Sequence, residues 1–415
     1  QLYAEAEEHR RAGRDSMAVA RYVDVIRKTG QAFRSRPESD WAAEAMFLLG
    51  RAHLRLADLS AAGGALREAA SRANDPKLRG EILVYLAVVR ADLGDRKGAL
   101  EQVDVSLEGP LSDASLAEAR LLRGRPMLEA ASAERGWWEL DRASEAEPSV
   151  RSEAGLELLR WAIATDDSDR SRLAIDGLLA YPGAGMRLDS ILSLVELAAK
   201  RWGDGRTADL LSGADSSTWD RKARGTIVLE RARRLKAAGD SAEAASQAWQ
   251  VAGGLGVSGA DARLLLSAWQ MAGSRDLVEI RKARAILLPA GGDERVGEML
   301  EAMDLLENYI SLGLDEPLGW FAAGEVARER LGADYLARGL FLAYADGARE
   351  DPWAPKALLA ALEASPDEGD RAWLRGRLER YADSPYVLAA YGGSAAGFQA
   401  LEEELEVRLR ELTRQ

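Results

Sequence analysis

Apolar residues recur at three- and four-residue intervals along most of the chain, which is the spacing of one face of an α-helix. One such stripe comprises Leu188, Ile191, Leu192, Val195 and Ala199. Runs rich in valine, isoleucine and threonine, which are typical of strands, are rare. Clusters containing glycine and proline, such as residues 181–183 and 289–292, separate the stripes. The pattern predicts an all-α chain of many short helices.

Small residues recur within these stripes at a fixed period. Gly50, Ala87 and Gly124 follow one another at intervals of 37 residues. At matching offsets after each come a second small residue, a larger apolar residue and a third small residue: Ala62, Leu66 and Ala69; Ala99, Val103 and Ser106; Gly136, Leu140 and Ala143. Small side chains let two helices cross closely, and the larger residue fills the space beside the crossing. Because one hairpin buries a single face, hairpins of this kind must stack.

These positions resemble the tetratricopeptide repeat (TPR), whose signature contains Leu-Gly, Ala, an aromatic residue, Ala and Pro. Leu49-Gly50, Ala62, Leu66 and Ala69 match that signature, and the third unit ends on Pro148. The period here is about three residues longer than that of the family. The resemblance implies an all-α, right-handed superhelical solenoid of antiparallel helix hairpins.

The quality of the match divides the chain into three parts. Residues 1–150 are predicted as an N-terminal TPR-like array, 151–290 as degenerate helical-hairpin repeats, and 291–415 as a C-terminal TPR-like array with a capping helix. A boundary between two arrays near 215 or near 290 is the alternative. The capping helix is predicted from an apolar stripe backed by acidic residues, which suits the polar outer face of a terminal repeat. Its members are Phe398, Leu401, Leu405, Leu409 and Leu412. A coiled-coil or partner-docking helix is the other interpretation of this stripe.

The composition argues against several classes of chemistry. A formal net charge of −13 disfavours binding to nucleic acid. The chain has no cysteine, and its two histidines, His9 and His53, are not at ligand spacing, so we expect neither a metal site nor a cofactor. The acidic run at 166–169 lacks the glycine and distal glutamate of a calcium loop and is predicted as a turn with a helix cap. We find no phosphate-binding or nucleophile motif, expect no catalytic residue, and predict that the chain is not an enzyme.

Binding of other proteins or peptide segments is the predicted activity. In the TPR family the first helix of each hairpin lines the concave surface, and the resemblance carries that role to eight residues here. They are Phe47, Arg51, Arg55, Tyr85, Val88, Leu122, Arg125 and Glu129. This mixed apolar and basic set suits an extended or helical peptide with apolar anchors and some acidic character. The alternative is that some of these residues are buried between repeats.

A second resemblance suggests a setting. The start of the chain is similar to that of bacterial envelope lipoproteins of the BamD-type and Tol-associated kinds, on the basis of residues 2–6, Gly13, Ala18 and 45–55. A later stretch, residues 380–386, is similar to the proline-containing connectors of those proteins. The resemblance implies a periplasmic, outer-membrane-associated scaffold or adaptor within a larger complex. The chain begins with Gln1 rather than Met, which leaves open whether a signal peptide or a lipid-anchored segment precedes it. The longest uncharged apolar run is far shorter than the ~20 residues of a transmembrane helix. A cytoplasmic regulatory repeat protein and a structural subunit of a larger assembly are the alternatives.

Overall fold

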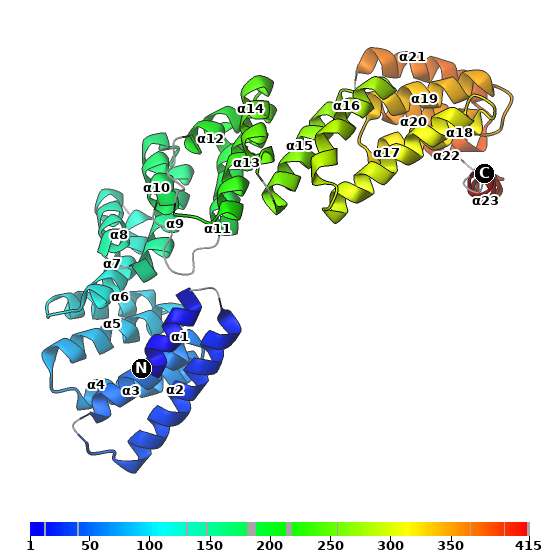
Figure 1. The fold of residues 1–415 in the computed structure, drawn as a ribbon. Helices are drawn as coiled ribbons and strands as arrows, with labels where there is room; N and C mark the ends of the chain where they lie inside the picture. Colours follow the sequence, from blue (N-terminus) through cyan, green and yellow to red (C-terminus); the bar gives the residue numbers. More distant parts are fainter. Residues whose placement is uncertain are drawn as a thin grey trace. The chain divides into compact units, whose positions relative to one another are not determined.

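The computed structural model describes residues 1–11, 14–39, 41–129, 132–146, 148–180, 188–212, 218–254, 256–365, 367–393 and 395–412. Within these ranges the regular structure is entirely helical, and no strand occurs (Figure 1). The prediction of an all-α fold is therefore confirmed. The predicted turn at Gly13 and the predicted helix-separating cluster at 181–183 lie outside the described residues.

The chain divides into two compact units. Unit 1 comprises Gln1–Ile227 and Ala237–Gly239, and unit 2 comprises Val228–Lys236 and Asp240–Gln415. The division falls inside α13 (Arg221–Ala237), near the alternative boundary at 215. The division at 150 and 290 reflects how closely each segment matches the repeat signature, and it stays a prediction.

Consecutive helices of unit 1 pack in pairs, α1 with α2 through to α11 with α12. The first helices of neighbouring pairs also contact one another, from α3 through α5, α7 and α9 to α11, so they run side by side. The helices are α1 (Leu2–Arg11), α2 (Asp15–Ser35), α3 (Ala42–Arg55), α4 (Leu59–Arg72), α5 (Pro76–Asp92), α6 (Arg96–Leu107), α7 (Asp113–Leu128), α8 (Ala133–Ala146), α9 (Pro148–Ala164), α10 (Ser168–Ala180), α11 (Leu188–Trp202) and α12 (Asp204–Leu210).

Glycine residues mark the closest helix crossings of unit 1. A Cβ atom added at Gly50 of α3 would lie 2.6 Å from Cγ of Leu66 on α4. A Cβ at Gly124 of α7 would lie 2.8 Å from Cγ of Leu140 on α8. Both leucines are fully buried. The repeat therefore works as its spacing indicates: the small residue admits the partner helix, and the leucine fills the adjoining space.

Three turns in the described part of unit 1 share a two-residue motif that ends one helix and caps the next. The first residue has a positive φ angle, and the aspartate after it accepts a backbone N–H of the next helix, at 2.9–3.1 Å. The pairs are Ala57-Asp58, Gly94-Asp95 and Asp166-Asp167. The last pair lies in the acidic run at 166–169, and Asp167 caps α10 there as predicted.

Unit 2 comprises most of α13 and the helices that follow it, with a small apolar core between α13, α14 and α15 and a large one from α15 onward. Rings of Phe321, Phe341 and Tyr344 meet edge to face in that core, with centroids 5.5 Å apart. The elements are α14 (Ser241–Ala252), α15 (Val257–Ala272), α16 (Leu277–Leu287), η1 (Leu288–Ala290), α17 (Glu294–Leu312), α18 (Leu318–Glu325), the π-helical turn η2 (Val326–Arg330), α19 (Asp334–Gly347), α20 (Ala354–Glu363), α21 (Glu368–Leu378), η3 (Glu379–Tyr381), α22 (Pro385–Ala390) and α23 (Phe398–Leu412).

The C-terminal helix α23 packs on unit 2 through its leucine stripe. Leu405 and Leu412 are buried in the core of that unit, and the indole of Trp353 donates a hydrogen bond of 3.1 Å to the carbonyl of Leu401. The ring of Phe398 packs on Tyr386 of α22 at 5.3 Å between centroids. The helix α23 contacts α18 and α22 of the same unit, and its role as a terminal cap stays a prediction.

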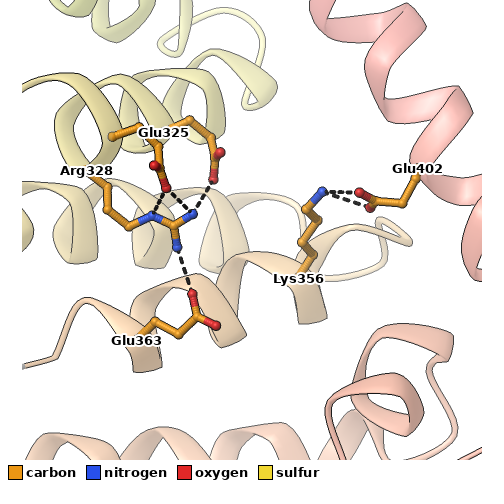
Figure 2. Close-up of polar contacts among 6 residues, drawn as sticks. Glu325, Arg328, Lys356, Glu363 and Glu402 are labelled. Carbon is orange, nitrogen blue, oxygen red and sulfur yellow. Dashed lines mark hydrogen bonds and ion pairs between the residues drawn. The ribbon is translucent and has the colours of Figure 1, made fainter. Parts of the chain in front are cut away.

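A lysine joins α20 to α23. Lys356 donates to both carboxylate oxygens of Glu402, each at 2.8 Å (Figure 2). The ammonium group also lies 5.9 Å from the ring centroid of Phe321 and 5.7 Å from that of Tyr386. Because aromatic faces attract cations, the rings hold the lysine where it meets the carboxylate.

We expect Lys356→Met to loosen α23 while unit 2 stays folded. Methionine keeps most of the aliphatic stem but removes the ammonium group that joins Glu402 to the two rings. Both side chains of the pair are about a third exposed (28% and 34%), so the cost should be about 1 kcal/mol. Hydrogen exchange of the amides of α23 measures the effect. Lys282→Met, which removes a surface pair within α16, is the matched control, and equal protection of α23 in both variants would contradict the expectation.

Candidate functional site

The first helices of unit 1 surround a hollow. Residues from α3, α5, α7 and α9, with a contribution from α6, line a space of about 850 Å³, which we call the α3–α9 hollow. Ligand-binding clefts commonly enclose ~300–1,000 Å³. Six of the eight residues predicted to contact a partner line it: Arg55, Tyr85, Val88, Leu122, Arg125 and Glu129.

The other two predicted residues lie behind the wall of the hollow. Phe47 is buried, and its ring packs edge to face on Tyr85 with 5.4 Å between centroids. The guanidinium of Arg51 lies 4.9 Å from the ring centroid of Tyr85 and 4.5 Å from that of Tyr3. Both residues hold Tyr85 in place. Phe47 is therefore buried between repeats, as the alternative interpretation of the eight residues predicted.

Sequence reasoning missed several residues of the hollow. Glu118 precedes Leu122 and Arg125 by four and seven residues and so lies on the same face of α7, a spacing that could have identified it. The residues from α9 carried no such signal, because that segment lacks the repeat signature. The additional polar and aromatic lining residues are Asp92, Arg96, Glu118, Glu153, Glu157, Arg160 and Trp161.

The apolar side chains of the hollow are held in place by neighbouring helices. The indole of Trp161 donates a hydrogen bond of 3.0 Å to the carbonyl of Leu128, which joins α9 to the end of α7. Its ring also packs on Trp137 of α8, at 5.7 Å between centroids. Together with Tyr85 and Leu122 on the neighbouring helices, Trp161 forms a preformed apolar surface.

Most arginines of the hollow are neutralised within the protein. Nε of Arg55 lies 3.1 Å from a carboxylate oxygen of Glu7 on α1. Arg125 pairs with Glu153 and, at 3.4 Å, with Glu157 of α9. Arg160 also pairs with Glu157, at 2.9 Å. Of the arginines from which an acidic partner was expected, Arg55 and Arg125 therefore already have acidic partners, whereas Arg51 contacts aromatic rings instead.

Two carboxylates of the hollow, unlike most of its arginines, have no charged partner within the described part of the chain. Glu118 of α7 and Asp92 of α5 make no hydrogen bond or ion pair with any residue that the structure describes. Burial raises the pKa of Glu118, and the nearby Arg55 only partly offsets that rise. Burial and the charge of Glu153 raise the pKa of Asp92. Glu118 and Asp92 thus leave unpaired negative charge in the hollow, beside one lining arginine, Arg96, that has no ion pair with the described residues.

A proline adds a further acceptor. Pro126 lies inside α7 and lines the hollow. Proline has no N–H, so the carbonyl of Leu122, one turn earlier, lacks its intrahelical donor. Pro126 therefore removes one backbone donor from the stretch of α7 that lines the hollow.

The histidines make local contacts. Nδ1 of His53 lies 3.3 Å from Asp58, and Nδ1 of His9 accepts a hydrogen bond of 2.9 Å from Arg14. Across the described ranges, no cluster of three or more acidic or histidine side chains is arranged to hold a metal ion. None of the helices described there combines the length and the apolar character needed to cross a membrane.

A second polar cluster lies in unit 2. Arg328 of η2 forms ion pairs with Glu329 at 2.8 Å, Glu363 at 3.0 Å and Glu325 at 3.6 Å (Figure 2). Its guanidinium also lies 5.7 Å from the ring centroid of Phe341. These contacts join the π-helical turn to α20, which indicates a structural role for the cluster.

Comparison with known proteins gives little similarity. No protein-family model matches the chain, and no curated protein matches it. Among solved structures, the crystal structure of BtubC (BKLC) from P. vanneervenii is similar over 55% of this chain and 86% of that chain, with 16% identity and a TM-score of 0.28. A TM-score at this level supports no argument about fold or function. The resemblances to the tetratricopeptide repeat and to envelope lipoproteins stay predictions from the residues.

Proposed function

We propose that this protein is a binding scaffold that holds a segment of a partner protein in the α3–α9 hollow. The main support is the convergence of two independent lines of reasoning. Six residues chosen from the sequence alone line one hollow of about 850 Å³ in the folded unit.

The physical character of the hollow suits a peptide. Its centre is aromatic and aliphatic, with Tyr85, Leu122 and Trp161, and its edges are charged. Apolar anchors in a preformed pocket with a polar rim are the usual arrangement of a tight protein interface. Since four stacked helices line the hollow, a segment lying across it would contact several repeats at once.

The setting that we propose is the bacterial cell envelope, with the cytoplasm as the alternative. It rests on the resemblance of the first residues to BamD-type and Tol-associated lipoproteins. Fractionation of the native host, with immunodetection of the full-length protein, tests it. Recovery with the outer membrane would support the proposal, and recovery in the cytosol would overturn it while leaving the binding function intact.

Site-specific photocrosslinking tests the binding function. A photoreactive amino acid at Leu122, inside the hollow, is expected to capture a defined partner segment in the native host. The same amino acid at Val105, an exposed position on α6, should not capture it. A synthetic peptide of the captured segment should then bind the wild-type protein at least tenfold more tightly than Leu122→Asp, about 1.4 kcal/mol. Equal crosslinking from both positions, or equal affinity for Leu122→Asp and the control Val105→Asp, would refute the proposal.

A further inference from the structure

The chemistry of the occupant can be read from the charges that are left unpaired in the α3–α9 hollow. Three of the four lining arginines, Arg55, Arg125 and Arg160, each meet a carboxylate of this chain, and only Arg96 on α6 has no such partner among the described residues. An acidic ligand would therefore have to displace an existing ion pair to bind any of those three. It would also approach Glu118 and Asp92, and like charges at close range oppose binding.

A cationic side chain would find carboxylates in the hollow that are not already paired with a described residue. The carboxylates of Glu118 and Asp92 have no partner among the described residues, and Pro126 leaves the carbonyl of Leu122 without its helical donor. Lysine and arginine carry several donors and no acceptor, so one such group can donate to both oxygens of a carboxylate.

We infer that the bound segment carries a lysine or arginine whose charged group binds the carboxylate of Glu118, flanked by apolar residues on the aromatic wall. This inference rests on the proposed function of the hollow. It replaces the acidic character expected from the sequence with a basic one.

The surroundings of Glu118 favour such a side chain over a small cation. The rings of Tyr85 and Trp161 also line the hollow, and aromatic faces attract ammonium and guanidinium groups. Val88 and Leu122 offer apolar surface for the aliphatic stem of a long basic residue. A basic residue therefore gains both charge pairing and apolar contact here.

Acid should weaken this binding. Burial raises the pKa of Glu118, so its carboxylate begins to take up a proton at a pH above the ~4.3 of an ordinary glutamate. As the pH falls through that range the negative charge disappears, and affinity for a basic peptide falls with it. The charged and titratable groups that face Glu118 are Arg51, Arg55, Tyr85, Asp92, Arg125 and Glu153.

Selection from a random dodecapeptide library on the full-length protein tests the inference. Peptides retained by the wild-type protein are expected to be enriched in lysine and arginine next to apolar residues. Their affinity should fall at least tenfold in Glu118→Gln, which keeps the shape of the side chain but not its charge. Glu101→Gln, at an exposed glutamate of α6, is the matched control and should bind as the wild type does.

Failure of the inference and failure of the proposed function have different signatures. If the selected peptides lose binding in Leu122→Asp but are acidic or neutral and bind Glu118→Gln normally, the hollow binds peptides and the basic occupant is wrong. If no selected peptide is sensitive to Leu122→Asp, the proposed function itself is wrong.

Thermal unfolding checks the fold, and Glu118→Gln should melt no lower than the wild type because it removes an unpaired, partly buried charge. A shift of the selected peptides toward acidic residues on Glu118→Arg would further support the inference.

Discussion

Gly136→Ala is expected to destabilise unit 1 by about 3 kcal/mol, at the upper end of the cost of overpacking. The added Cβ would lie 2.5 Å from the backbone nitrogen of Leu128, 2.7 Å from the carbonyl carbon of Met127 and 2.9 Å from the carbonyl oxygen of Gly124. All three are main-chain atoms of α7, so no change of rotamer relieves the contact. The helices α7 and α8 would have to move apart.

Hydrogen exchange at the amides of α7 and α8 measures this loss locally, which matters because a chain of two units need not unfold in one step. Gly64→Ala is the control, since a Cβ at Gly64 in α4 meets no atom within 4 Å. That substitution should stabilise unit 1 by about 0.5–1 kcal/mol, because alanine is the better helix former. If the two variants showed the same protection, the close crossing of α7 and α8 would be ruled out. Since α7 carries Glu118 and Leu122, Gly136→Ala should also weaken binding in the α3–α9 hollow.

Glu7→Gln is the second substitution from which we expect a large effect, of about 3 kcal/mol or more at neutral pH. The buried carboxylate accepts hydrogen bonds from Tyr22 at 2.6 Å, from Nη2 of Arg10 at 2.9 Å and from Nε of Arg55 at 3.1 Å. It thereby joins α1 to α2 and α3. An uncharged amide would leave the guanidinium of Arg55 partly buried without its countercharge.

The pH dependence of this effect follows from the pKa of Glu7. Burial opposes the charge, but Arg55, Tyr22 and Arg10 together lower the pKa to about 2. The unfolded chain has a glutamate pKa of ~4.3, so the unfolded state binds the proton more tightly. The charge of Glu7 therefore stabilises unit 1 fully above about pH 4.3, and this contribution is lost as the pH falls toward 2.

Urea denaturation of the wild type and Glu7→Gln from pH 7 to pH 3 measures this contribution. The two proteins should differ at pH 7 and converge toward the acid end. Glu5→Gln, which removes a more exposed pair with Arg21, should differ from the wild type by less than 1 kcal/mol. A constant difference between Glu7→Gln and the wild type across the pH range would contradict the assigned role. The variant also frees Arg55, so its affinity for basic peptides should fall.

Local patterns in the amino-acid sequence were enough to predict the helices and many of their contacts. The period that links Gly50 to Gly124 identified the helix crossings, because small residues at helical spacing have a direct geometric meaning. The cap in the acidic run at 166–169 was also visible, since it depends on a few consecutive residues. The resemblance to the tetratricopeptide repeat then directed attention to the first helices of the hairpins, six residues of which line the α3–α9 hollow.

The charge of that hollow was not visible in the sequence. Arg55 and Arg125 suggested a basic surface, but Glu7 lies 48 residues before Arg55 and Glu153 lies 28 residues after Arg125. Helix periodicity and capping act over a few residues, and a linear pattern records them. Which charges neutralise each other depends on helices brought together by packing of the whole unit. Folding alone determined that Arg55 and Arg125 are paired and that Glu118 has no ion pair with the described residues.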